Sequence, residues 1–155
     1  MKIALGQLNP IVGDLVGNAQ QISEAIRVAH RQDADLLVTS ELVLIGYPPR
    51  DLLLRSGVVD QCQWMLETLA QEAGGMPVLV GHPAAAISGM RPLVNRVSLL
   101  HEGRVEPVAD KRLLPGYDVF DEDRYFEPGH QPGLLNLCGT SIGVLICEDL
   151  WRASD

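Results

Sequence analysis

Three polar residues of the kinds used in covalent catalysis each follow a stretch of sequence that predicts a β-strand. Glu41 follows LLVTS, Lys111 follows VEPVAD and Cys147 follows GVLI. Open α/β sheets place their sites at the carboxyl ends of strands, so we expect these side chains to lie near one another. A thiol becomes a nucleophile when a base or a positive charge is close, and a glutamate and a lysine supply one of each. The lysine could also donate to the oxyanion of a tetrahedral intermediate.

Each of the three residues also has a purely structural explanation when it is taken alone. Free cysteine is among the most buried residue types, and acids and lysines at strand ends mostly face water. The remaining cysteines, Cys62 and Cys138, form no CxxC pair, and the four histidines show no HxH or HExxH spacing, so no metal site is predicted. The glycines form neither GxGxxG nor a P-loop, which gives no support for nucleotide binding in this segment.

The elements that would position these residues follow from periodicity and turn signals. Strands are predicted at 2–8, 35–40 and 77–82, with amphipathic helices between them at 18–32 and 58–73. Two hairpins follow, at 93–101 with 104–110 and at 134–137 with 141–146. This order predicts an α/β fold with a mixed sheet and helices covering one of its faces. The loop at 112–132 is rich in aromatic residues and is therefore predicted to be ordered and functional.

Length and charge limit the classes of function. The chain has 155 residues, of which 46% are apolar, and suits one domain with a core. A net charge of −8 argues against nucleic acid as a partner. The apolar runs are too short to cross a membrane, which needs about 20 residues. The start of the chain lacks the apolar stretch of a signal peptide, so we expect a cytoplasmic protein with reduced thiols.

Three motifs together resemble the nitrilase (carbon–nitrogen hydrolase) superfamily. SELVLIGYPPRDLL at 40–53 is similar to its glutamate motif, DKRLLPGYDVFDEDRYFEPG at 110–129 to its lysine motif and GVLICEDLW at 143–151 to its cysteine motif. The resemblance covers residues 2–151 and implies an α-β-β-α sandwich with a mixed sheet. It also implies Glu41 as general base, Lys111 as oxyanion stabiliser and Cys147 as nucleophile. Lys111 would lower the pKa of the thiol and the carboxylates would raise it, and the sequence leaves the net direction open.

The GYPP-x-DLL form of the first motif is similar to the glutaminase domains of glutamine-dependent NAD synthetases. That resemblance implies L-glutamine as substrate and a second glutamate at Glu122. It implies substrate contacts at Tyr117, at the backbone of Phe120 and at Glu148, where a backbone N–H would assist Lys111 with the oxyanion. The chain reads PGYD around Tyr117 where the family more often reads PNYG, which predicts a difference in the turn that presents this side chain.

Such glutaminase domains continue beyond the cysteine motif, so residues 1–155 are expected to be a partial, N-terminal portion of a domain. We expect no cofactor in this segment, ATP and Mg²⁺ only in a synthetase domain outside it, and a homo-oligomeric parent protein. Three functions remain open: glutamine hydrolysis that supplies ammonia for ATP-dependent synthesis of NAD from deamido-NAD, a stand-alone amidase acting on a small amide, and a catalytically silent fragment.

Overall fold

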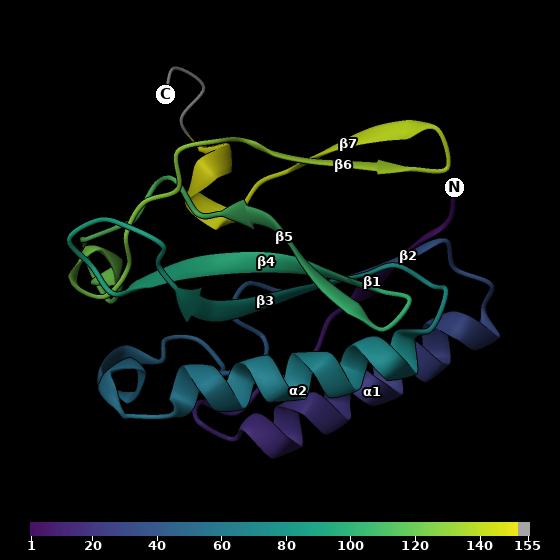
Figure 1. The fold of residues 1–155 in the computed structure, drawn as a ribbon, viewed down its shortest axis with the longest axis horizontal. Coiled ribbons are helices and arrows are strands. Elements are labelled where there is room, and N and C mark those ends of the chain that lie inside the picture. The colour runs from purple at the N-terminus through teal and green to yellow at the C-terminus, as the bar shows by residue number, and fades with distance from the viewer. Residues whose placement is uncertain (152–155) are drawn as a thin grey trace.

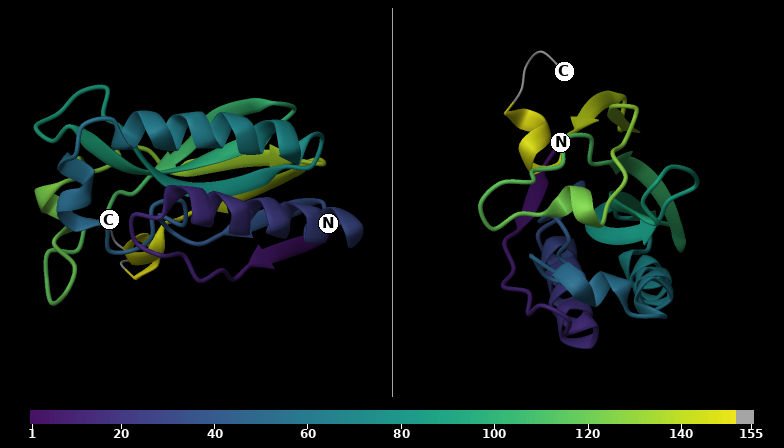
Figure 2. Two further views of the ribbon diagram at one scale, coloured as in Figure 1. Left: turned by 90° about the horizontal axis from the view of Figure 1, so that it is seen from below. Right: turned by 90° about the vertical axis from the view of Figure 1, so that its left-hand side faces the viewer.

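The computed structural model describes residues 1–151 and has a five-stranded mixed sheet at its centre. The strands follow one another across the sheet in chain order: β1 (Ile3–Gly6), β2 (Leu36–Thr39), β3 (Val78–Ala85), β4 (Leu93–His101) and β5 (Arg104–Asp110). β1, β2 and β3 are parallel, and β3, β4 and β5 are antiparallel. The predicted α/β class and mixed sheet are therefore confirmed, and β1 forms one edge of the sheet (Figures 1 and 2).

Two helices, α1 (Leu15–Arg31) and α2 (Val58–Ala73), pack side by side on one face of this sheet (Figure 1). Their apolar stripes meet the sheet, with Ile22, Ile26 and Leu66 fully buried. α1 begins three residues before its predicted start because the Asp14 side chain accepts a hydrogen bond from the Gly17 N–H, 2.9 Å away, and caps the helix. None of the helices among residues 1–151 is both long and apolar enough to cross a membrane.

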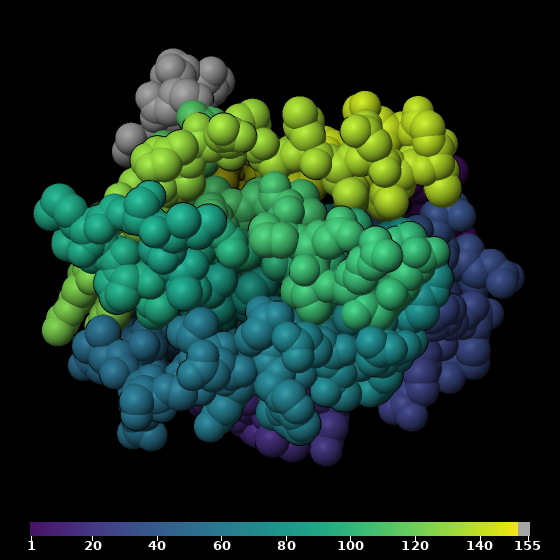
Figure 3. Space-filling model, viewed as in Figure 1, coloured from purple at the N-terminus to yellow at the C-terminus, as the bar shows by residue number. Residues whose placement is uncertain are grey.

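The second hairpin forms a separate two-stranded sheet from β6 (Gly133–Leu137) and β7 (Thr140–Val144). It lies over the face of the main sheet opposite the helices, along the upper edge of the surface in Figure 3. Leu135 and Ile146 pack there against apolar side chains of the main sheet in a second, smaller core, whose other members are Leu36, Leu79, Val97, Leu99 and Ala109. The described residues thus supply three successive layers: helices, main sheet and hairpin.

β7 ends two residues earlier than predicted, so the expectation that Cys147 directly follows a strand is wrong. Leu145 and Ile146 intervene, and Cys147 is the first residue of a short 3₁₀ helix, Cys147–Leu150. The Ile146 N–H donates to Oδ2 of Asp149 at 3.1 Å, so it is used within the turn and not in a strand ladder. The sulfur is therefore carried by a tight turn beyond the hairpin.

The long segment between the hairpins is ordered, as its aromatic residues predicted. Tyr125 and Phe126 are buried. The Tyr125 hydroxyl donates to Oδ1 of Asp51 at 2.6 Å, which ties the segment to the 3₁₀ helix Arg50–Leu54 of the GYPPRDLL motif. Another 3₁₀ helix, Glu122–Arg124, lies within the segment and holds Glu122 in a buried position.

Candidate active site

Glu41 lies in the turn that follows β2, at the carboxyl end of the parallel strands. This turn crosses close to β3 at Gly81, where a Cβ atom would stand only 2.6 Å from Leu42 N and Ser40 O. A side chain larger than hydrogen at residue 81 would push the turn away. Glycine at this point of β3 therefore allows the Glu41 backbone to pack against the sheet.

Lys111 directly follows Asp110, the last residue of β5, and its ammonium group is completely buried. Its backbone N–H donates to the carbonyl of Asn95 on β4 at 2.8 Å. Its Nζ atom donates to Oε1 of Glu41 at 2.7 Å and to Oε1 of Glu122 at 2.8 Å. An ammonium has three N–H donors, and within residues 1–151 these two carboxylates accept from two of them, which leaves the third for another acceptor. The geometry therefore supplies a buried cation with one donor available.

The two carboxylates of this cluster offset the free-energy cost of burying the Lys111 charge. Burial lowers the pKa of Lys111, but the carboxylates of Glu41 and Glu122 outweigh it and the net direction is upward. Burial raises the pKa of Glu122, and the nearby Glu41 carboxylate adds to this, against the lowering effect of Lys111. Lys111 is therefore held as a cation between two carboxylates.

Two further side chains complete the cluster, and sequence reasoning missed both. The Tyr47 hydroxyl donates to Oε1 of Glu122 at 2.7 Å, and the Asn95 Nδ2 donates to Oε1 of Glu41 at 2.7 Å. Burial, and then the carboxylate of Glu122, raise the pKa of Tyr47, so its hydroxyl stays a donor. A signal existed for each: Tyr47 lies inside the GYPP motif, and Asn95 is one of three polar residues in the otherwise apolar stretch LVNRVSLL.

Cys147 faces this cluster from the turn beyond the hairpin. A pocket of about 110 Å³ is lined by Cys147, Glu41 and Asn95, with apolar residues such as Leu79 and Ile146. Cys147 is exposed, yet partial desolvation, followed by the Glu41 carboxylate, raises the pKa of its thiol, and Lys111 only partly opposes them. The net direction that the sequence left open is therefore upward, and the group stays a protonated thiol until a base removes its proton.

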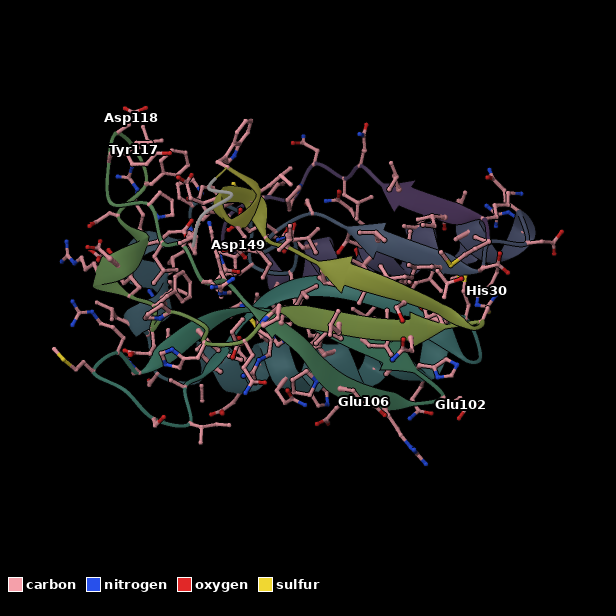
Figure 4. All side chains as sticks on the ribbon, turned by 90° about the horizontal axis from the view of Figure 1, so that it is seen from above. His30, Glu102, Glu106, Tyr117, Asp118 and Asp149 are labelled. Atoms are coloured by element: carbon pink, nitrogen blue, oxygen red, sulfur yellow. The ribbon has the colours of Figure 1, made fainter. Side chains whose placement is uncertain are left out.

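The predicted substrate contacts Tyr117, Phe120 and Glu148 are not among the described residues that line this pocket. Glu148 directly follows Cys147 in the chain, and the Phe120 ring lies beside that of Tyr47, with 6.2 Å between centroids. The Tyr117 hydroxyl donates to Oε2 of Glu148 at 2.9 Å, and the Tyr117 ring meets the Phe120 ring edge-on at 5.3 Å between centroids. Tyr117 is 55% exposed, and Figure 4 shows it with Asp118 on a projecting loop, apart from Asp149. These side chains therefore contact one another on the solvent side of the buried cluster.

Residues 2–153 match the carbon-nitrogen hydrolase family over nearly the whole chain. The chain belongs to this family. It is 44% identical over 155 residues to the glutamine-dependent NAD(+) synthetase of Synechocystis sp., covering 97% of this chain and 28% of that protein. The corresponding enzyme of Acinetobacter baylyi is 41% identical over 150 residues, covering 97% of this chain and 27% of that protein. The chain thus spans little more than a quarter of the curated relatives that it matches.

Solved structures of family members share the fold. The glutamine-dependent NAD+ synthetase from Acinetobacter baumannii superposes with a TM-score of 0.90 at 38% identity, over 97% of this chain and 28% of that one. A mutant of the amidase from Nesterenkonia sp. AN1, which carries acrylamide added to its active site cysteine, superposes with a TM-score of 0.81 at 28% identity, over 97% of this chain and 58% of that one. The resemblance to the nitrilase fold is therefore confirmed.

The other two cysteines considered from the sequence lie in other elements than the cluster of Glu41, Lys111, Glu122 and Cys147. Cys62 is buried on α2, and desolvation raises its pKa to about 12. Cys138 lies exposed in the β6–β7 turn. Within residues 1–151 no group of three or more histidine, cysteine or acidic side chains is arranged to hold a metal ion.

Proposed function

We propose that this chain is the glutamine-hydrolysing part of a glutamine-dependent NAD synthetase. The observation that carries the proposal is the position of Lys111, held between two carboxylates, with Cys147 and Glu41 lining one pocket. The similarity to NAD synthetases along almost the whole chain supports glutamine as the amide. The ammonia released would serve ATP-dependent amidation of deamido-NAD, and ATP and Mg²⁺ would act in a domain beyond this chain.

The first half of the proposed reaction forms a thioester. Glu41 takes the proton of the Cys147 thiol while sulfur attacks the carboxamide carbon of glutamine. The free N–H donor of Lys111 and the backbone N–H of Glu148 stabilise the oxyanion. When the tetrahedral intermediate collapses, the C–N bond breaks, Glu41 returns the proton to nitrogen and ammonia leaves. The raised pKa of the Cys147 thiol fits this order of steps. A thiol that is protonated at rest needs Glu41 to remove its proton as the sulfur attacks.

The second half hydrolyses the thioester. Glu41, again a carboxylate, takes a proton from water as its oxygen attacks the thioester carbon. Lys111 stabilises the second oxyanion in the same position. Collapse breaks the C–S bond, the proton returns to sulfur and glutamate is released. Glu122 holds the Lys111 ammonium in place for this step, and Asn95 holds the Glu41 carboxylate.

The experiment uses the complete gene product. Cys147→Ala should abolish NAD synthesis driven by glutamine and leave synthesis driven by added ammonium salts unchanged. Glu106→Gln, which removes an exposed carboxylate on β5, should leave both activities intact. Glutaminase activity that survives Cys147→Ala would show that the nucleophile lies elsewhere.

The likeness to the Nesterenkonia amidase favours a second candidate, a nitrilase-type amidase that acts on a small amide. The chemistry on Cys147 would be the same and only the substrate would differ. Comparing kcat/KM for glutamine with that for a short aliphatic amide separates the two functions. An ATP-binding synthetase domain encoded downstream would favour glutamine, and its absence from the reading frame would favour the small amide.

A third candidate is a chain that is catalytically silent by itself. The edge strand β1 exposes apolar side chains, with Leu5 70% and Ile3 44% accessible, and such edges associate readily. Glutaminase turnover by a monodisperse 155-residue monomer with cooperative thermal unfolding would contradict it.

A further inference from the structure

The turn that carries Cys147 has an unusual link to the segment that carries Lys111. β7 ends at Val144, so this turn lies outside the strand ladder, and Cys147 itself has φ +48° in the left-handed region. That conformation is uncommon for a residue with a side chain and persists where the surroundings hold it. Contacts from outside the turn are therefore needed to keep the sulfur in one place.

Asp149 supplies such contacts through both oxygens of its carboxylate. Oδ1 accepts from the backbone N–H groups of Arg112 and Leu113, at 3.0 and 2.9 Å. Oδ2 accepts from the backbone N–H of Ile146 at 3.1 Å. The residues bonded on one side directly follow Lys111, and the residue bonded on the other directly precedes Cys147. Figure 4 shows Asp149 beside the turn after β7.

We propose that Asp149 is a positioning residue, which sets the Cys147 sulfur relative to Lys111 and Glu41 by joining the backbones next to the cysteine and the lysine. Capping the 3₁₀ helix requires only the bond to Ile146, so the two bonds to Arg112 and Leu113 add a long-range link. Hydrogen bonds to a carboxylate are stronger than neutral ones, which suits a link of three backbone donors to one side chain. The inference rests on the proposed role of Cys147 as nucleophile.

The test measures how strongly Cys147 senses its charged neighbours. In the complete gene product, the pH dependence of Cys147 alkylation by iodoacetamide gives the thiol pKa, with peptide mapping by mass spectrometry and exposed Cys138 as internal reference. Glu41 and Glu122 raise this pKa and Lys111 lowers it. Lys111→Met removes the cation that lowers the thiol pKa and should therefore raise it further in the otherwise unchanged protein.

Asp149→Asn keeps the side-chain shape but turns an NH₂ group toward a backbone N–H, which breaks the link. In this variant the thiol pKa should fall toward its ordinary value, and Lys111→Met should shift it by less than half as much. Glu106→Gln should leave both values unchanged. Equal effects of Lys111→Met with and without Asp149 would overturn the proposal, because a residue that only caps the helix would not alter this coupling.

Asp149→Glu is the second variant, since it keeps the charge but displaces the carboxylate, and it should behave like Asp149→Asn. If both variants lose their cooperative thermal transition, Asp149 serves folding and the proposal is overturned. The proposed function fails separately, when the Cys147 thiol of the otherwise unchanged protein does not respond to Lys111→Met at all.

Discussion

The Nζ atom of Lys111 lies 2.7 Å from Oε1 of Glu41 and has no exposure to solvent. A buried ammonium loses its hydration, and here two carboxylates replace it, since Glu122 lies at 2.8 Å on the other side. The same arrangement puts two negative charges close together. Each carboxylate therefore depends on the lysine for its own stability, and the lysine connects the chemistry of the site to the stability of the fold.

Lys111→Met should destabilise the protein as well as inactivate it. Removing the cation leaves the half-buried Glu41 and the buried Glu122 without the charge that both of them pair with, and breaking a buried ion pair costs about 3–5 kcal/mol. Urea unfolding at neutral pH measures the loss. The double variant Lys111→Met with Glu122→Gln removes the repulsion as well and should recover part of it. Equal stability of the single and the double variant would contradict the proposed repulsion.

Glu41→Gln should separate the reactivity of the thiol from turnover. Desolvation is the main cause of the raised Cys147 pKa and the Glu41 charge is the next, so the pKa should fall when that charge is removed. Amide hydrolysis should nevertheless fall by about 10²–10⁴-fold, because the proposed general base is lost. Alkylation by iodoacetamide across pH, together with ammonia release from glutamine, checks both effects. A thiol pKa that stays the same or rises would show that Glu41 does not face the sulfur.

Sequence patterns located two of the three main residues well, for a physical reason. Lys111 directly follows β5, and only Ser40 separates Glu41 from the end of β2. The apolar residues and turn signals of these strands are local properties of the chain, and the carboxyl ends of both strands meet the same site. For Cys147, the stretch GVLI is apolar throughout and predicts a strand that runs up to the cysteine. Beyond β7, the Ile146 N–H bonds to Asp149 three residues ahead, and the other oxygen of that carboxylate accepts from Arg112 and Leu113, which are 37 and 36 residues away. The first contact is local, but a local pattern does not contain the second, which fixes where the turn lies.

The contacts of Asn95 and Tyr47 also join residues that are far apart in the chain, so local sequence patterns do not predict them. Asn95 meets Glu41 across 54 residues, and Tyr47 meets Glu122 across 75. Both contacts arise only once the turn after β2, strand β4 and the long aromatic segment have packed together. Motif resemblance suggested Glu122, whereas Asn95 had only its polar character in an apolar strand to mark it.

Asn95→Ala should impair catalysis more than it impairs folding. Its Nδ2 donates to the same Glu41 oxygen that accepts from Lys111, so the pair of donors fixes the orientation of that carboxylate. Losing a hydrogen bond to a charged group costs about 1.5–3 kcal/mol, and part of this cost should appear as a lower kcat. Asn136→Ala, which removes an exposed amide in β6, is the matched control. Unchanged kcat in the Asn95 variant would mean that Lys111 alone orients Glu41.

The last prediction concerns the pH dependence of stability, through His82 on β3. This side chain is 2% exposed, with Nδ1 3.0 Å from the Pro83 carbonyl and Nε2 2.8 Å from Ser98 Oγ. A carbonyl only accepts, so Nδ1 carries the proton, and Nε2 accepts from the Ser98 hydroxyl. The ring is thus neutral in the fold, and desolvation lowers its pKa from 6.5 to about 4.

Between about pH 6.5 and 4 the unfolded chain binds a proton at His82 and the folded chain does not. The stability that the neutral ring contributes is therefore complete above pH 6.5 and is lost as the pH falls toward 4, by up to about 3 kcal/mol. His82→Gln should remove this part of the slope, whereas His130→Gln, at an exposed position, should keep it. Urea unfolding at a series of pH values measures the slope directly. Equal slopes in the two variants would show that His82 takes up its proton in the folded state as readily as in the unfolded state.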